Sequence, residues 1–361
     1  MLKVLIQYYE IKKDARVLEL LKKYFDYLNK EIPKRPMIQW SKARIGDLLY
    51  CIHWYCEQTG ETQGELVAEL RKQALDWNGV FKEFPFTRPS EYYYNWKSLL
   101  EHYQKPFVDD IMKYHTNHIV NLTMGFKYPA MLSYFFDDMD FEKITEMGLR
   151  SAHRYHGVVS GVVNGDEHLA GNNPSRGSEL CSVVEYMFSL QTMAEAFGTG
   201  RYTDQIEKLA YNALPATITE DFMAHQYLQQ ANQVLVSKAK RDWFNTNDES
   251  NLFGLEPNFG CCTANMHQGW PKLLKSMWLK EDENTLISMV HGPSSIVTEL
   301  AGNRVSISEE TEYPFKNRIC YRVTEGNAPS AVFRIWIPEW CKDFRVCIDG
   351  AWKNRERTED T

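Results

Sequence analysis

Residues 15–32, ARVLELLKKYFDYLNKEI, carry their apolar side chains at helical spacing. The residues that fall on one face are Val17, Leu20, Leu21, Tyr24, Phe25 and Leu28. A stripe of this kind predicts an amphipathic helix that packs on a core through its apolar face. The same periodicity recurs over roughly the first 280 residues, so we expect the N-terminal part of the chain to be helical.

Further helices are predicted wherever this periodicity returns between loops rich in Gly, Pro, Asn and Asp. Their expected ranges are 44–60, 61–77, 92–104, 106–125, 140–156, 178–197, 203–214 and 263–278. Helical hairpins that follow one another in this way suit an (α/α)6-type toroid. These helices are fewer than a closed barrel of six hairpins requires, so we expect the toroid to be incomplete.

After about residue 283 the pattern changes to short, β-branched segments that partly alternate, with turn residues between them. The expected strands lie within 286–300, 304–310, 317–325, 331–338 and 344–350. Helices first and strands afterwards indicate two domains rather than one βαβ sheet. We therefore predict a mainly α protein, with an α/α-barrel domain over residues 1–282 and a partial β-sandwich domain over residues 283–361.

The composition excludes some classes of function. A net charge of −7 and a pI of about 5.9 argue against a nucleic-acid partner, because such a partner requires a basic surface. The sequence has no run of about 18 apolar residues, so we expect no transmembrane helix and no membrane partner. The N-terminal residues lack the apolar core of a signal peptide. We therefore expect a cytoplasmic location for the chain as given, whereas a longer parent could be secreted or periplasmic.

Two of the eight cysteines, Cys261 and Cys262, are neighbours in the sequence. Vicinal cysteines rarely bridge each other, because a disulfide needs Cα atoms farther apart than one peptide unit easily allows. The pair is better explained as metal ligands or reactive thiols. Gly260 frees the backbone just before them, at the expected start of a helix, where unpaired N–H groups lower the pKa of a thiol.

A second motif, Glu179-x-Cys181, lies at the expected start of a helix that Ser178 can cap, with Glu179 in the first turn. This motif and the vicinal cysteines together offer three sulfurs and one carboxylate, which match the four ligands usual for zinc. Sulfur-rich ligation disfavours magnesium and calcium. The candidate ligands are therefore Glu179, Cys181, Cys261 and Cys262. Inert buried cysteines are also common, and spacing alone leaves both interpretations open.

The order of Glu-x-Cys at 179–181 and Gly-Cys-Cys at 260–262 resembles the bacterial β-L-arabinofuranosidase family of glycoside hydrolases. The strand region resembles the same family in Tyr313-Pro314-Phe315 and in RIWIPEW, residues 334–340. The resemblance implies an (α/α)6 barrel, which is the catalytic domain, followed by β-sandwich domains. It also implies one Zn²⁺ held by the four candidate ligands, with Cys261 as the nucleophile that attacks the anomeric carbon.

The resemblance implies further site residues by motif match. The acid/base glutamate of the family lies in a Gly-Glu segment, for which this chain has Gly-Asp-Glu, so Glu167 is assigned to this role and Asp166 is the competing carboxylate. Glu207 matches a carboxylate close to the nucleophile, and His118 matches a substrate-binding histidine. Without the resemblance, Glu207 would be taken as a solvated helix residue, and for His118 an ordinary helix histidine and a functional one would remain equally open. Another family histidine has no match, because this chain has Arg44 near its place.

Together these residues predict a retaining glycoside hydrolase that cleaves terminal β-L-arabinofuranosyl or related sugars. The expected partner is a carbohydrate, such as a plant-type arabinose-containing glycan or a glycoprotein oligosaccharide. For the protein itself, a homodimer is one possible assembly. A first alternative is a non-catalytic, zinc-stabilised carbohydrate-binding or scaffold protein. A second alternative is an α/α-toroid enzyme acting on other sugars, such as an uronyl hydrolase or an epimerase, whose chemistry uses Asp or His and needs no thiol cluster.

Overall fold

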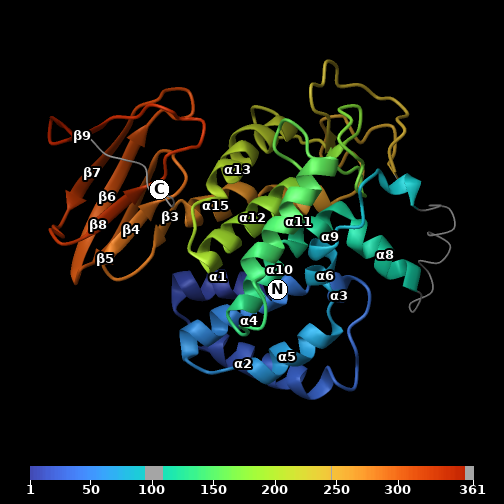
Figure 1. Ribbon diagram of the computed structural model, residues 1–361, viewed down its shortest axis with the longest axis horizontal. Helices are drawn as coiled ribbons and strands as arrows, with labels where there is room; N and C mark the ends of the chain where they lie inside the picture. The colour runs from blue at the N-terminus through green and yellow to red at the C-terminus, as the bar shows by residue number, and fades with distance from the viewer. Residues whose placement is uncertain (94–108, 245, 354–361) are drawn as a thin grey trace.

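The computed structural model describes residues 1–93, 109–244 and 246–353. Within these ranges, helices come first along the chain and the main strands follow. The helical part and the strand part lie beside each other (Figure 1). The order of elements agrees with the two kinds of domain that the sequence predicts.

The N-terminal helices form the lower part of the molecule in Figure 1. They are α1 (Leu2–Lys12), α2 (Arg16–Glu31), α3 (Trp40–Ala43), α4 (Ile45–Thr59), α5 (Gly64–Gln73) and α6 (Trp77–Lys82). In α2 the buried side chains are Val17, Leu21, Phe25 and Leu28, which confirms most of the predicted apolar face. The helix α4 ends at Gly60 as expected, because its φ of 71° is the left-handed C-cap that glycine adopts readily.

The remaining helices surround one long buried helix, α12 (Leu180–Phe197). They are α8 (Asp109–Asn117), α9 (Ile119–Gly125), α10 (Lys127–Ser133), α11 (Phe141–His156), α13 (Thr203–Lys208), α14 (Cys261–Met266) and α15 (Gly269–Ser276). Every side chain of α12 from Leu180 to Ala194 is buried. The helices α9, α10, α14 and α15 pack against it, so α12 forms the centre of the helical domain.

Several predicted helices differ from the structure in length or continuity. The predicted helix over 92–104 lies almost entirely outside the described residues. The predicted helix over 106–125 is divided into α8 and α9, because His118 has an extended backbone (φ −62°, ψ 122°) and its side chain caps α9 by accepting from the N–H of Asn121. The predicted helix over 263–278 is likewise divided, into α14 and α15.

The prediction that Glu179 lies in the first turn of a helix is wrong. Ser178 and Glu179 form a short strand, β1 (Ser178–Glu179), which pairs antiparallel with β2 (Leu228–Gln229). This pairing holds the backbone of Glu179 extended (φ −72°, ψ 132°), and α12 starts only at Leu180. The ladder with β2 is a long-range contact, so no local pattern in the sequence indicates it.

The strand region contains two three-stranded sheets. In the sheet β3-β4-β8, β3 is antiparallel to β4 and β8 is parallel to it, whereas β5-β6-β7 is an antiparallel meander. This arrangement confirms the predicted architecture, an α/α-toroid-type domain followed by a β domain. The bounds are β3 (Trp278–Lys280), β4 (Thr285–Ser288), β5 (Ser294–Leu300), β6 (Asn303–Thr311), β7 (Ile319–Glu325) and β8 (Val332–Ile335), with a hairpin of β9 (Val346–Ile348) and β10 (Ala351–Lys353).

The β domain is joined to the helical domain by polar contacts with α13 and the π-helical turn that follows it, η2 (Leu209–Ala213). The carboxylate of Asp204 accepts from Trp336 Nε1 and from the N–H of Glu339, each at 2.8 Å. The hydroxyl of Tyr211 donates to the carbonyl of His291. These bonds fix the β domain to one edge of the helical domain.

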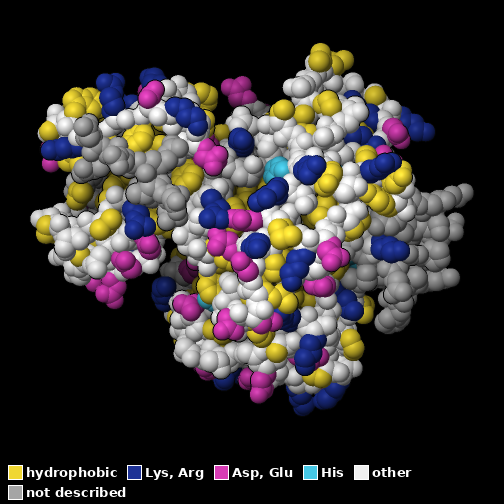
Figure 2. Space-filling model, viewed as in Figure 1, with side chains coloured by type: hydrophobic (Ala, Val, Ile, Leu, Met, Phe, Trp, Pro, Cys, Tyr) yellow, Lys and Arg dark blue, Asp and Glu magenta, His cyan; other side chains and the backbone are white. Residues whose placement is uncertain are grey.

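The surface carries charges of both signs. Figure 2 shows Lys and Arg side chains interspersed with Asp and Glu across the visible face, without a continuous basic stripe there. This view agrees with the net charge of −7. In the part of the chain that the structure describes, no helix is both long enough and apolar enough to cross a membrane.

Candidate active site

The residues predicted as metal ligands meet at one point: Glu179, Cys181, Cys261 and Cys262. One oxygen or sulfur atom from each lies within 4.8 Å of those from the others. The sulfurs of Cys181 and Cys262 are 3.3 Å apart. The sulfur of Cys261 is 3.9 Å from Oε1 of Glu179. Of the four residues, Cys261 is the exposed one, so solutes can reach its sulfur.

The ends of regular elements hold these side chains in place. Glu179 pairs with Leu228 across the β1–β2 ladder. The helix α12 begins directly after it, which places Cys181 in the first turn. The vicinal cysteines are the first two residues of α14, which packs against α12. Segments far apart in the sequence therefore meet where two helices begin.

The donor atoms fit a metal ion. A tetrahedral ion with sulfur ligands at about 2.3 Å requires sulfurs about 3.8 Å apart, and the observed separation of Cys181 and Cys262 is close to that value. Oε2 of Glu179 is buried and has no hydrogen-bond partner among the described residues. Buried oxygens normally have a partner, and beside three sulfurs a metal ion is the partner that would satisfy this one. We conclude that the cluster could hold a metal ion.

The three thiols differ in their affinity for a proton. Hydrogen bonds from Cys181 and Cys262 lower the pKa of Cys261 to about 3. The bond to Cys261 raises the pKa of Cys181, and burial raises the pKa of Cys262. Burial also raises the pKa of Glu179, and the charge of Glu167 adds to this effect. Negative charge in the cluster therefore concentrates on the exposed sulfur of Cys261.

Glu167 lies next to the cluster and is held from two sides. The hydroxyl of Tyr227 donates to its Oε2 at 2.6 Å, and Nε2 of His118 lies 3.1 Å from its Oε1. Its backbone has φ 91°, a region that costs a non-glycine residue about 1–3 kcal/mol. Its carbonyl accepts from the N–H of Ile119 at 3.0 Å, which helps to hold this conformation. The predicted acid/base residue and the predicted substrate-binding His118 are thus in direct contact.

Asp166, the competing carboxylate, has different partners. Arg176 holds it through Nε at 2.8 Å and Nη2 at 3.3 Å. Burial raises the pKa of Asp166 to about 7, although the positive charge of Arg176 opposes this rise. Asp166 is thus paired with a permanent cation, whereas the partners of Glu167 are a hydroxyl and an imidazole that can themselves exchange protons, so Glu167 is the better candidate for proton transfer to a substrate.

Glu207 lies elsewhere in the domain. It belongs to α13, and its carboxylate is 3.4 Å from Nε1 of Trp340 in the β domain. The thiol cluster is at the start of α12, whose 18 residues make it about 27 Å long, and α13 follows the opposite end of that helix. Among the described contacts, none joins Glu207 to Cys261. A role beside the nucleophile stays a prediction for this residue.

Two functional candidates were not predicted from the sequence. Tyr227 stands between Glu167 and Cys261: its hydroxyl donates to Glu167 and also interacts with the sulfur of Cys261. The ring of Trp40 lies 5.1 Å from that of His118 and contacts Arg44 as well. Neither residue belongs to a recognisable motif; only the fold of distant segments shows their positions. The one signal for Tyr227 is its place just before the strand that pairs with Glu179.

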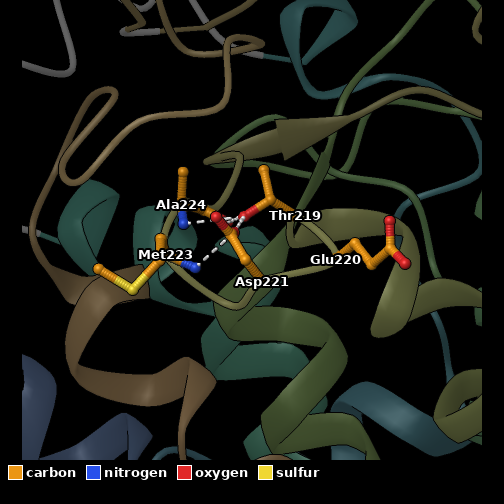
Figure 3. Close-up of a pocket in the computed structure, with 5 residues that line it drawn as sticks. All are labelled: Thr219, Glu220, Asp221, Met223 and Ala224. Carbon is orange, nitrogen blue, oxygen red and sulfur yellow. Dashed lines mark hydrogen bonds between the residues drawn. The ribbon is translucent and has the colours of Figure 1, made fainter.

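A pocket of about 590 Å³ lies at the loop of residues 219–224, outside the cluster. Thr219, Glu220, Asp221, Met223 and Ala224 line it (Figure 3). Oδ1 of Asp221 accepts from the hydroxyl of Thr219 at 2.6 Å and from the N–H of Met223 at 3.0 Å. This carboxylate therefore stabilises its own loop, and the pocket includes none of the four candidate ligands.

Comparison with family profiles covers most of the chain. Residues 1–275 match the profile "Beta-L-arabinofuranosidase, GH127 catalytic domain". Residues 285–361 match "Beta-L-arabinofuranosidase, GH127 middle domain". No curated protein sequence matches the chain.

Solved structures share the fold at low sequence identity. A structure named "Glycoside hydrolase" has a TM-score of 0.60 at 14% identity, and the match covers 100% of this chain and 68% of that one. A GH127 β-L-arabinofuranosidase from Geobacillus stearothermophilus T6 gives 0.57 at 16%, covering 98% and 66%. A GH127 β-arabinofuranosidase gives 0.57 at 12%, covering 99% and 67%. The chain thus spans about two thirds of the length of these structures.

Proposed function

Because the chain belongs to the GH127 family of glycoside hydrolases, we propose that it is a retaining glycosidase that cleaves terminal β-L-arabinofuranosyl or related sugar residues. The observation that carries this proposal is the exposed Cys261 of the thiol cluster, which lies next to the Tyr227–Glu167 pair. A nucleophile and a proton donor that lie within one site are the two groups that such a reaction requires.

The proposed metal is zinc. Three sulfurs and one carboxylate form a donor set that zinc accepts and that magnesium and calcium disfavour. Glu179, Cys181 and Cys262 would hold the ion together with Cys261. When bound, it would keep the thiol of Cys261 deprotonated at neutral pH. The orphaned Oε2 of Glu179 supports this assignment.

In the first step the sulfur of Cys261 attacks the anomeric carbon of the bound sugar. A carbon–sulfur bond forms while the bond to the leaving oxygen breaks, and Glu167 gives its proton to that oxygen. The products of this step are the free leaving group, a thioglycoside on Cys261 and an ionised Glu167. His118 and Tyr227 keep the carboxylate of Glu167 oriented while its charge changes.

In the second step Glu167 takes a proton from a water molecule. The oxygen of this water attacks the anomeric carbon, the carbon–sulfur bond breaks, and Cys261 returns to the thiolate form. Two displacements at the same carbon give retention of configuration. The released sugar is the second product, and both residues regain their initial protonation states.

The substrate that we propose is a plant-type arabinose-containing glycan or the oligosaccharide of a glycoprotein. Support comes from the family match and from the solved structure named a β-L-arabinofuranosidase, which has the same fold. A second candidate is a non-catalytic, metal-stabilised carbohydrate-binding protein. Four protein ligands would fill a tetrahedral site and leave no open position, as in structural metal sites, and this feature favours the second candidate.

A screen of aryl glycosides, with zinc content measured on the same sample, tests the proposal. We expect release of the aryl group from a β-L-arabinofuranoside or a related glycoside, at a ratio of about one zinc per chain. Cys261→Ser should abolish this turnover, whereas Cys347→Ser, which alters an exposed cysteine of the β domain, should not. Full zinc content without cleavage of any glycoside would support the binding protein instead. Near-normal turnover in Cys261→Ser would exclude Cys261 as the nucleophile.

A further inference from the structure

Phe259 precedes Cys261 by two residues and lies next to the proposed nucleophile. Its carbonyl oxygen is 4.0 Å from the sulfur of Cys261. Its ring packs against the ring of Tyr227, with 5.7 Å between the centroids and 77° between the planes. The hydroxyl of the same Tyr227 donates to Glu167. Phe259 therefore borders both groups that the proposed reaction uses, the sulfur and the acid.

The side chain of Phe259 is 41% exposed, although it packs against Tyr227. Single exposed apolar side chains are common on proteins, so the position and the neighbours of this ring decide what it means. An exposed ring beside an exposed nucleophile is a surface that a bound substrate would cover. Such cover is favourable, because it removes apolar area from water.

Further exposed apolar side chains belong to two loops that are joined to each other. The backbones of His225 and Gly254 exchange two hydrogen bonds, of 3.0 and 3.1 Å, which join the hairpin of residues 218–225 to the segment that leads to Phe259. Met223 of this hairpin also lines the cavity of about 590 Å³ (Figure 3). The large apolar side chains exposed on these two loops, besides Phe259, are Phe222, Met223, Phe253 and Leu255.

Hydrogen bonds hold the segment that carries Phe259 in place. The hydroxyl of Thr263 donates to the carbonyl of Leu255 at 3.0 Å, and Nε2 of His225 lies 2.9 Å from the same hydroxyl. The N–H of Asn247 donates to Oδ1 of Asn258 at 3.2 Å. A ring that is fixed before its ligand arrives loses less conformational freedom when it binds.

The burial of the site indicates which part of a substrate reaches Phe259. Glu167 and His118 are buried, as is Glu179 of the thiol cluster, so the site is closed on their side. Cys261 and Phe259 are exposed, so the site is open on theirs. An enzyme that removes a terminal sugar holds that sugar at the closed end, and the unit that leaves extends towards solvent. In this chain the leaving unit would therefore extend past Phe259.

We propose that Phe259 is the platform of a leaving-group subsite, which binds the leaving unit through a flat apolar face. This inference rests on the proposed function and adds the recognition of its leaving group. An aromatic ring has such a face, and so does the C–H side of a further sugar. A methyl group does not. If Phe259 only supported the ring of Tyr227, ligands with different leaving units would bind equally well.

Binding of three ligands that cannot be hydrolysed tests the proposal without relying on turnover. Each carries β-L-arabinofuranose, or the sugar that the glycoside screen identifies, joined through carbon to a methyl group, a phenyl ring or a second sugar. They are titrated into the metal-loaded wild-type protein. We expect the phenyl ligand, the disaccharide ligand or both to bind about tenfold tighter than the methyl ligand. The ligand that shows this preference identifies the leaving unit as an aromatic group or as a sugar.

Phe259→Ala should reduce this preference to less than about twofold and leave the affinity for the methyl ligand unchanged, because the terminal sugar does not touch the ring. Phe259→Tyr, which keeps the ring, should keep the preference. Phe315→Ala is the matched control, because Phe315 is an exposed phenylalanine of the β domain. Zinc content and thermal unfolding report whether each variant is folded.

Two outcomes would overturn the inference and leave the proposed function intact. One is equal binding of all three ligands, and the other is a preference that survives in folded Phe259→Ala. If none of the three ligands binds and no glycoside is cleaved, the proposed function and the inference fail together.

Discussion

The hydroxyl of Tyr227 donates a 2.6 Å hydrogen bond to Oε2 of Glu167 and also interacts with the sulfur of Cys261. A hydroxyl has one proton, so it can donate to only one of these acceptors at a time. When Glu167 holds its own proton, the hydroxyl of Tyr227 becomes available to the thiolate. Tyr227 therefore links the protonation of the proposed acid to the charge of the proposed nucleophile.

Tyr227→Phe should lower kcat/KM about 10²-fold, because it removes the hydroxyl that donates a hydrogen bond to Glu167, whose charge changes during the proposed reaction. It should also shift the pH profile of kcat/KM, since Glu167 and Cys261 lose their common partner. Steady-state kinetics over a range of pH values measures both effects.

Tyr211→Phe provides the control, because Tyr211 also donates one hydrogen bond but lies at the β-domain interface. It should leave the pH profile unchanged. An unaltered profile in Tyr227→Phe would mean that this hydroxyl does not couple the two groups.

Cys262→Ala should lower the zinc content of the purified protein and its melting temperature together. The proposed ion would bind the folded chain through residues from separate elements, so its loss would remove part of the folding free energy. Cys51→Ala, which alters a buried cysteine outside the cluster, should keep the full zinc content. Metal analysis with calorimetry on the same samples tests this, and equal zinc content in both variants would contradict it.

Lys272→Met should stabilise the protein at pH 7 by about 1–3 kcal/mol. Nζ of Lys272 is buried without a hydrogen-bond partner among the described residues and lies 4.1 Å from the centre of the Phe188 ring. Burial lowers the pKa of this lysine to about 8, so the folded state disfavours its charge.

The stability advantage of Lys272→Met over the wild type should decrease as the pH rises. Below about pH 8 Lys272 is charged in both states, and the full cost of its burial is present. Between about pH 8 and 10.5 the folded protein loses the proton before the unfolded chain does, so the wild type gains stability and the advantage of Lys272→Met shrinks. Urea unfolding at pH 7 and pH 10 measures the difference. An advantage that grows with pH would refute the burial argument.

Asp204→Ala should reduce stability by about 2 kcal/mol, because Trp336 Nε1 and the N–H of Glu339 lose a charged acceptor. The β domain should then unfold at a lower temperature than the helical domain. Calorimetry would show this as a second transition or a broadened one. Asp221→Ala, whose carboxylate bonds only within its own loop, should keep the wild-type profile.

Local patterns in the sequence predict much of the fold. The apolar stripe of residues 15–32 predicts α2 because its side chains pack within a few turns of one another. The left-handed C-cap at Gly60 is equally local. The strands after residue 283 follow from alternation and β-branched residues, and the two three-stranded sheets and the β9–β10 hairpin contain them.

The sequence predicts the site less completely. The motifs around Glu179 and Cys261 identify the four candidate ligands, and the structure brings them together. The strand that positions Glu179 is not predicted, because it exists only through pairing with Leu228. Tyr227 and Trp40 are missed for the same reason, since their positions in the site depend on contacts between segments far apart in the chain.

The separation of the ligands along the chain affects how the protein is made. Cys181 and Cys262 are 81 residues apart, and the sulfurs meet only after the intervening chain has folded back. A ribosome that has not yet synthesised α14 exposes a chain with Glu179 and Cys181 alone, which is too few ligands for a stable tetrahedral site. Capture of the proposed ion would therefore be a late step of biogenesis, and a bound ion would show that the chain has been made and folded as far as α14.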